Sequence, residues 1–120
     1  MKPLFLILII TFISFHVLSQ NTTQTQTIKG SVKDLNSEFP LPGVNIILID
    51  SDPFLGTITD ENGQFRLENV PPGRQSILVT YVGYKSQSIP NLLVTSGKEV
   101  IVNIHLEESV ETLQEVVITP

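Results

Sequence analysis

The feature that most constrains this fold is a hydrophobic alternation with a period of two, which runs through residues 27–106. Successive side chains of a β-strand point to opposite faces of a sheet, so apolar residues at every second position indicate strands with one buried face. Turn-forming residues interrupt the pattern about every eight to twelve positions, which is typical of an all-β sandwich or barrel. No segment shows a helical pattern. The sequence therefore predicts an all-β domain of about six or seven strands over residues 27–106.

The alternation also predicts which side chains face the core. The inward positions are Ile28, Gly30, Val32, Phe65, Leu67, Val100, Val102, Ile104 and Leu106, and the outward ones are Gln64, Arg66, Glu68, Ile101, Asn103 and His105. Residues 44–49 are apolar on both faces except at Asn45, which favours a central strand. Residues 77–84 are predicted to form one long strand, in which Gly83 marks a bulge or bend.

Proline, glycine and aspartate divide the strands. The structural turns are predicted at Gly43, Asp60, Gly63, Gly73 and Gly83. At residues 60–63 we expect a hairpin turn in which the Asp60 side chain binds its own backbone and Gly63 adopts a positive φ. A further turn at Ser96-Gly97 precedes the last strand.

The first residues are typical of a secretory signal peptide. Lys2 is followed by an apolar stretch at residues 4–18, and this stretch is shorter than the roughly 20 residues of a membrane span. Small residues before Gln20 favour cleavage after Ser19, so residues 1–19 form the predicted signal peptide; an uncleaved anchor is the alternative. Residues 20–26 are polar and predicted to form a flexible lead. Because no cysteine is present at the cleavage site, a bacterial lipoprotein anchor is excluded.

Composition limits both stability and partners. The chain has no cysteine, so the exported domain depends on its hydrophobic core without disulfides. With Lys2 removed from the seven basic residues, six remain against twelve acidic residues, which gives a net charge of −6. The basic residues are scattered, which argues against binding to nucleic acid or to an anionic membrane.

No residues form a convincing catalytic or metal-binding pattern. His105 is the only histidine after the signal peptide, so a zinc site or histidine triad lacks partners. Asp60 and Asn62 resemble the start of a calcium loop, but the distal ligands of such a loop are missing. Asp50 and Asp52 lie in a predicted solvated loop. Tyr81 and Tyr84 could stack on a ligand, although strand aromatics more often complete a core. We predict no catalytic residues, cofactor or metal, and no enzyme activity.

The last residues, 107–120, have a different character. They contain four glutamates, no basic residue, and the β-favouring run Val116-Val117-Ile118-Thr119 before Pro120. Such a run on an acidic linker is suited to strand addition to the open sheet edge of another protein.

Four blocks carry a family resemblance: Ile28-Lys29-Gly30-Ser31-Val32-Lys33-Asp34, Pro40-Leu41-Pro42-Gly43-Val44-Asn45-Ile46, residues 56–60 with 63–65, and Tyr81-Val82-Gly83-Tyr84. They resemble the carboxypeptidase-regulatory-like domain. This resemblance implies a seven-stranded Greek-key β-sandwich, as in transthyretin. The family takes its name from a non-catalytic appendage of zinc carboxypeptidases, and the zinc ligands are not found in this sequence.

A second resemblance lies in residues 111–119, which are similar to the TonB box of TonB-dependent outer-membrane receptors. In the SusC/RagA-like receptors of Bacteroidetes, the same sandwich domain lies between the signal peptide and the TonB box, and a plug and a barrel follow. The resemblance implies a periplasmic location at the outer membrane of a Gram-negative bacterium, a role in nutrient uptake, and the TonB C-terminal domain as partner. The implied contact residues are Leu113, Gln114, Glu115, Val116, Val117, Ile118 and Thr119.

Two other functions stay open. The chain could be a stand-alone secreted or surface β-sandwich that serves in binding or adhesion. It could also be an accessory domain of a peptidase. In either case residues 107–120 would be an ordinary acidic linker.

Overall fold

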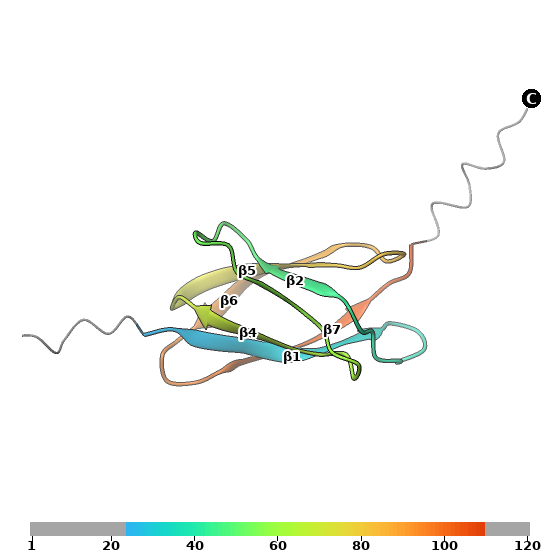
Figure 1. Cartoon of the computed structure of the whole chain (residues 1–120), viewed down its shortest axis with the longest axis horizontal. Coiled ribbons are helices and arrows are strands. Elements are labelled where there is room, and N and C mark those ends of the chain that lie inside the picture. The colour runs from blue at the N-terminus through green and yellow to red at the C-terminus, as the bar shows by residue number, and fades with distance from the viewer. Residues whose placement is uncertain (1–23, 110–120) are drawn as a thin grey trace, which may run out of the picture.

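The computed structural model describes residues 24–109, which form a two-layer β-sandwich (Figure 1). Its strands are β1 (Gln26–Asp34), β2 (Asn45–Leu48), β3 (Gly56–Ile58), β4 (Gln64–Val70), β5 (Gly73–Thr80), β6 (Gln87–Val94) and β7 (Val100–Leu106). Within these residues, one sheet has the order β4-β1-β7 and the other has the order β3-β2-β5-β6. The prediction of an all-β, seven-stranded sandwich is confirmed. In the same residues, no helix is long and apolar enough to span a membrane.

The first and last strands are neighbours. β1 pairs antiparallel with β4 on one side and parallel with β7 on the other. The register of the β1–β7 pair extends from Ile28 opposite Val100 to Asp34 opposite Leu106. Because the two strands are parallel, β1 begins at one end of the long axis and β7 ends at the other (Figure 1).

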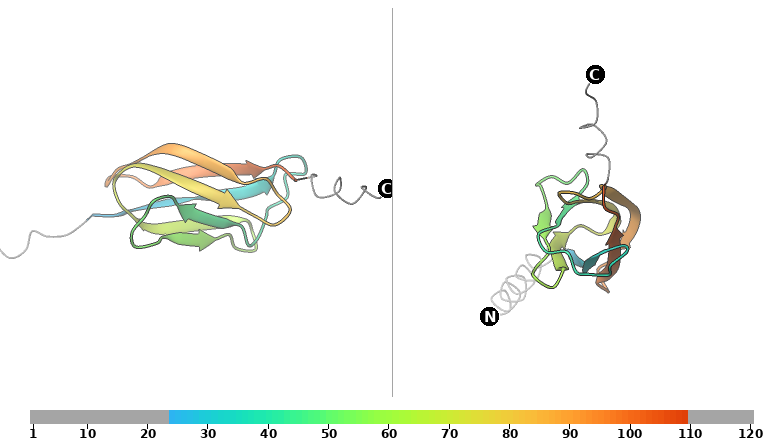
Figure 2. Two further views of the ribbon diagram at one scale, coloured as in Figure 1. Left: turned by 90° about the horizontal axis from the view of Figure 1, so that it is seen from above. Right: turned by 90° about the vertical axis from the view of Figure 1, so that its right-hand side faces the viewer.

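The core lies between the two sheets, and the end-on view in Figure 2 shows the strands around this common interior. Its largest fully buried side chains are Ile28, Ile46, Leu67, Ile77, Ile104, Leu106, Val32, Val44, Val70, Val79 and Val94. The predicted faces of β4 and β7 are confirmed, although Val100 and Val102 are only partly buried against the core. The predicted central strand is also confirmed, because β2 lies between β3 and β5.

The prediction of one long strand over residues 77–84 was wrong. β5 begins earlier, at Gly73, and ends at Thr80. The chain then turns, with Gly83 at φ 86° and a 3.2 Å hydrogen bond from the backbone nitrogen of Tyr84 to the carbonyl of Tyr81. The predicted bend at Gly83 is therefore present, as a turn that follows the strand. A bulge lies in β6, where the register with β5 shifts around Pro90 and Asn91.

The turn predicted at residues 60–63 is present, with Asp60 bound to its own backbone and Gly63 at positive φ, but the prediction that it forms a hairpin was wrong. β3 belongs to the four-stranded sheet and β4 to the three-stranded sheet, so this turn carries the chain from one sheet to the other. Asp60 Oδ1 accepts hydrogen bonds of 2.9 Å from the backbone nitrogens of Asn62 and Gln64. Gly63 has φ 72°, and a Cβ at this position would lie 2.7 Å from the carbonyl oxygen of Val32. Its close packing against β1 therefore requires glycine.

Candidate functional site

The predicted docking segment, Leu113 to Thr119, lies outside the described residues, as do the signal peptide and most of the polar lead. The structure does describe the residues that precede the docking segment.

Residues 107–109 are held against the turn at residues 81–84. The backbone nitrogen of Lys85 donates to the carbonyl of Glu107 at 2.9 Å, and that of Ser109 donates to the carbonyl of Gly83 at 2.8 Å. The side chains of Lys85 and Glu107 also form an exposed ion pair at 3.4 Å. The chain therefore leaves the domain along a fixed path.

The same turn is joined to the end of β1. The hydroxyl of Tyr84 donates a 2.7 Å hydrogen bond to Oδ2 of Asp34, a buried carboxylate. Oδ1 of Asp34 accepts from the backbone nitrogens of Asn36 at 2.8 Å and Ser37 at 2.9 Å. The ring of Tyr81 packs against that of Tyr84, with centroids 5.5 Å apart. We call Asp34, Tyr84 and residues 107–109 the exit clamp.

The electrostatics of the exit clamp favour a structural role. The hydrogen bond from the Ser37 backbone, followed by those from Tyr84 and the Asn36 backbone, lowers the pKa of Asp34 to about 2. The hydrogen bond to Asp34, followed by burial, raises the pKa of Tyr84 to about 12. A general acid or base needs a pKa near the working pH, and these two groups move away from neutrality in opposite directions. Near pH 7, Asp34 is thus ionised and Tyr84 keeps its hydroxyl proton.

The other polar residues considered in the sequence do not come together. His105 is exposed, with Nε2 3.4 Å from Oε2 of Glu38. Asp50 and Asp52 are exposed in a loop. The carboxylate of Asp60 accepts hydrogen bonds from the backbone of its own turn. Among residues 24–109, no group of three or more His, Cys, Asp or Glu side chains is placed to hold a metal ion.

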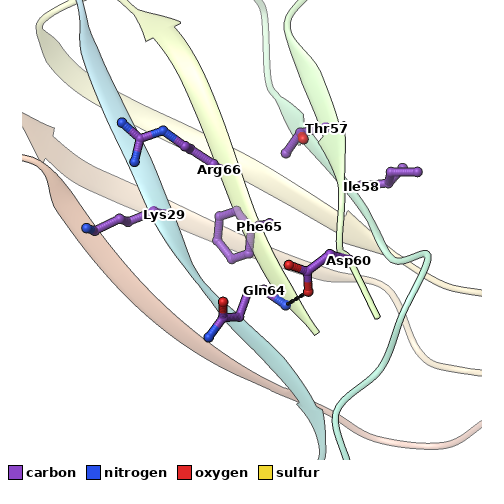
Figure 3. Close-up of a pocket in the computed structure, with 7 residues that line it drawn as sticks. All are labelled: Lys29, Thr57, Ile58, Asp60, Gln64, Phe65 and Arg66. Carbon is purple, nitrogen blue, oxygen red and sulfur yellow. Dashed lines mark hydrogen bonds between the residues drawn. The ribbon is translucent and has the colours of Figure 1, made fainter. Parts of the chain in front are cut away.

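A pocket of about 430 Å³ lies between the edge strands β3 and β4 (Figure 3). It is lined by Lys29, Thr57, Ile58, Asp60, Gln64, Phe65 and Arg66. Figure 3 shows Lys29 and Arg66 directed to the same side. Both contact Glu99, at 3.5 Å and 3.4 Å, and Arg66 also pairs with Glu68 at 2.8 Å. Because carboxylates already pair with these cations, the pocket is a poor site for an anion.

A second groove, of about 360 Å³, lies on the outer face of the four-stranded sheet. It is lined by Asn45, Ile47, Phe54, Gly56, Thr57 and Ile58. The side chains of Phe54 and Ile58 are unusually open, with 70% and 62% of their surface exposed. A Cβ at Gly56 would lie 3.0 Å from the ring of Phe54, so the absent side chain leaves room for the ring. This groove was not predicted from the sequence; the available signal was an aromatic residue in a loop two positions before a glycine.

Comparison with protein families identifies the domain. The CarboxypepD_reg-like domain matches residues 28–118. The chain belongs to this family. The CarboxypepD_reg-like match begins within β1 and continues beyond β7 into the predicted docking segment. Comparison with curated protein sequences found no match.

Solved structures show how widely this fold is used. The chain is similar to a type II cohesin-X-dockerin complex from Acetivibrio cellulolyticus, with a TM-score of 0.56 and 20% identity over 66% of this chain and 52% of that one. It is similar to BcpA, the major pilin subunit of Bacillus cereus, with a TM-score of 0.56 and 19% identity over 72% and 31%. It is also similar to catechol 1,2-dioxygenase from an Acinetobacter species, with a TM-score of 0.58 and 14% identity over 85% and 58%.

At these identities, the likeness concerns the fold alone. This CarboxypepD_reg-like chain spans about half the length of the cohesin-X-dockerin chain, and a smaller share of the pilin. Because one β-sandwich occurs in an enzyme, a pilin and a cohesin-X-dockerin complex, the fold does not specify a chemistry.

Proposed function

We propose that this CarboxypepD_reg-like domain is the non-catalytic, periplasmic N-terminal part of a TonB-dependent outer-membrane receptor for nutrient uptake. In this proposal, Leu113 to Thr119 dock to the C-terminal domain of TonB by strand addition. A plug and a barrel would follow in such a receptor.

The observation that carries this proposal is the position of the exit clamp. The core is closed by Ile104 and Leu106 of β7, and residues 107–109 are then fixed to the turn at 81–84. The β-favouring segment thus follows a sandwich that is already complete, which supports a role in contact with another protein.

The two edges of the four-stranded sheet also favour the tail as the added strand. β3 has three residues, and β6 contains Pro90 and a bulge, two features that reduce pairing with foreign strands. Backbone hydrogen bonds of residues 113–119 would provide affinity, and alternate side chains would provide specificity.

The test is an NMR titration of the ¹⁵N-labelled chain with the TonB C-terminal domain. The proposal expects shifts at the amides of Leu113 to Thr119 and none at β1 or β7. If the titration leaves residues 113–119 unchanged, the TonB proposal is wrong. Shifts confined to the sandwich would also contradict it and would favour the second candidate.

The second candidate is a stand-alone binding or adhesion module, and the Phe54 groove favours it. An open aromatic ring beside the exposed side chain of Asn45 offers both stacking and hydrogen bonding to a ligand. For a partner found by any route, Phe54→Ala should weaken binding while deletion of residues 110–120 leaves it intact. The reverse pattern would support the TonB proposal.

A further inference from the structure

The parallel pairing of β1 and β7 determines how an end-to-end load would act on this domain. The chain enters through Gln26 at one end of the sandwich and leaves after Leu106 at the other (Figure 1). Between these points the two strands run side by side, from Ile28 opposite Val100 to Asp34 opposite Leu106. Tension between the two ends would therefore pull the neighbouring strands in opposite directions along their axes.

Such a load shears the ladder. The evenly spaced hydrogen bonds of a parallel pair are then stressed together, so several must break at once. A load applied at adjacent ends of two strands instead opens the ladder one pair after another. Forced unfolding is governed by the unfolding barrier, which is higher when many bonds break in one step.

We propose that this sandwich is a tension-bearing link, in which the β1–β7 ladder carries load between the two ends of the domain. The proposal goes beyond TonB docking and does not depend on it. It concerns residues 26–109 only, and it applies to any partner or attachment that pulls on the ends.

Contacts in the middle and at the far end of the β1–β7 ladder fit this role. In its middle, Gly30 lies so close to β7 that any Cβ would overlap the carbonyl oxygen of Val102, so the two backbones are in close contact. At its far end, the hydrogen bond from Ser109 to Gly83 and that from Tyr84 to Asp34 connect the exit segment to the end of β1. A load that enters at Ser109 is thus shared with β1 and does not peel β7 away from its last residue.

The chain contains no cysteine, so two introduced cysteines define the points of pulling in the full chain. Thr25→Cys with Ser109→Cys applies the load end to end. Thr25→Cys with Lys98→Cys applies it at adjacent ends of the same ladder, because Ile28 lies opposite Val100. Single-molecule force spectroscopy at one pulling speed should give an unfolding force at least about twofold higher for the first pair. Equal forces, or a weaker first pair, would overturn the proposal.

The exit clamp is tested with the same two pairs of introduced cysteines. Tyr84→Phe should lower the end-to-end force by clearly more than the adjacent-end force, because only the first load passes through Ser109. Tyr81→Phe is the matched control and should change neither force, since the hydrogen bond to Asp34 comes from Tyr84. An equal loss in both directions for Tyr84→Phe would show that the clamp contributes general stability and no load sharing.

Discussion

The hydroxyl of Tyr84 donates a 2.7 Å hydrogen bond to Oδ2 of Asp34, which lies 50 residues earlier in the chain. This contact joins the turn after β5 to the last residue of β1. The exit segment is bonded to the same turn, so the two residues connect three parts of the sandwich that are distant in sequence.

The Asp34–Tyr84 pair predicts a specific pH dependence. Asp34 has a lowered pKa, so its contribution to stability is present above its ordinary value of 3.8 and is lost as the pH falls toward about 2. Tyr84 has a raised pKa, so its contribution is present below its ordinary value of 10.0 and is lost as the pH rises toward about 12. We expect the wild-type chain to melt about 5 °C above Tyr84→Phe between roughly pH 5 and pH 9, with a smaller difference on both sides.

Thermal unfolding followed by circular dichroism from pH 3 to pH 11 checks the prediction. Tyr81→Phe is the control, and its difference from wild type should not follow the same profile. A Tyr84→Phe difference that stays constant from pH 3 to pH 11 would show that the hydrogen bond does not control stability.

Gly30 and Gly97 form a second test, of the contact between β1 and β7. A Cβ at Gly30 would overlap the carbonyl of Val102, whereas a Cβ at Gly97 would meet nothing within 4 Å. We expect Gly30→Ala to lower the free energy of unfolding by about 3 kcal/mol or more, since the strands must separate. Gly97→Ala should stay within about 1 kcal/mol of wild type. Urea denaturation measures both, and similar losses would mean that the strands are not in close contact.

Local pattern predicted the strands because side-chain alternation is set by the strand itself. Phe65 and Leu67 are buried while Gln64 and Arg66 are exposed, as the period of two indicates. The sequence reading failed at residues 81–84, where aromatic and β-branched residues typical of a strand occur although the chain turns. Tyr84 in that turn donates to Asp34, and no neighbouring residue signals this contact.

The sequence also did not predict which of the two sheets β3 and β4 join. Residues 60–63 have the composition of a hairpin turn, but β3 pairs with β2 and β4 pairs with β1. The pairing of β4 with β1 is long-range, so it depends on the whole sandwich. The Phe54 groove was missed because Phe54, Gly56 and Asn45 come together only after β2 and β3 have paired.

Thr59 offers a third test, of a buried polar contact that connects two loops to the core. Its side chain is 3% exposed; Oγ1 donates to the carbonyl of Leu41 at 2.6 Å and accepts from the backbone nitrogen of Val44 at 2.9 Å. Thr59→Val keeps the shape but leaves both backbone groups without this partner, so we expect a loss of about 2–3 kcal/mol. Thr57→Val, on the partly exposed face of β3, should cost less than about 0.5 kcal/mol. Equal costs in chemical denaturation would contradict the assigned hydrogen bonds.

The last prediction separates strand addition from other ways in which residues 113–119 could bind TonB. Val117→Pro removes a backbone N–H from the predicted added strand, so we expect the Kd for the TonB C-terminal domain to rise at least about tenfold. Val117→Thr keeps both the N–H and the β-branched shape, so it should bind like wild type. Calorimetric titration measures the Kd, and thermal unfolding should show the same Tm for both variants because position 117 lies beyond β7. Wild-type affinity of Val117→Pro would exclude strand addition at this position, whereas loss of binding in both variants would indicate recognition of the valine side chain. Only a loss confined to the proline variant supports binding through the backbone.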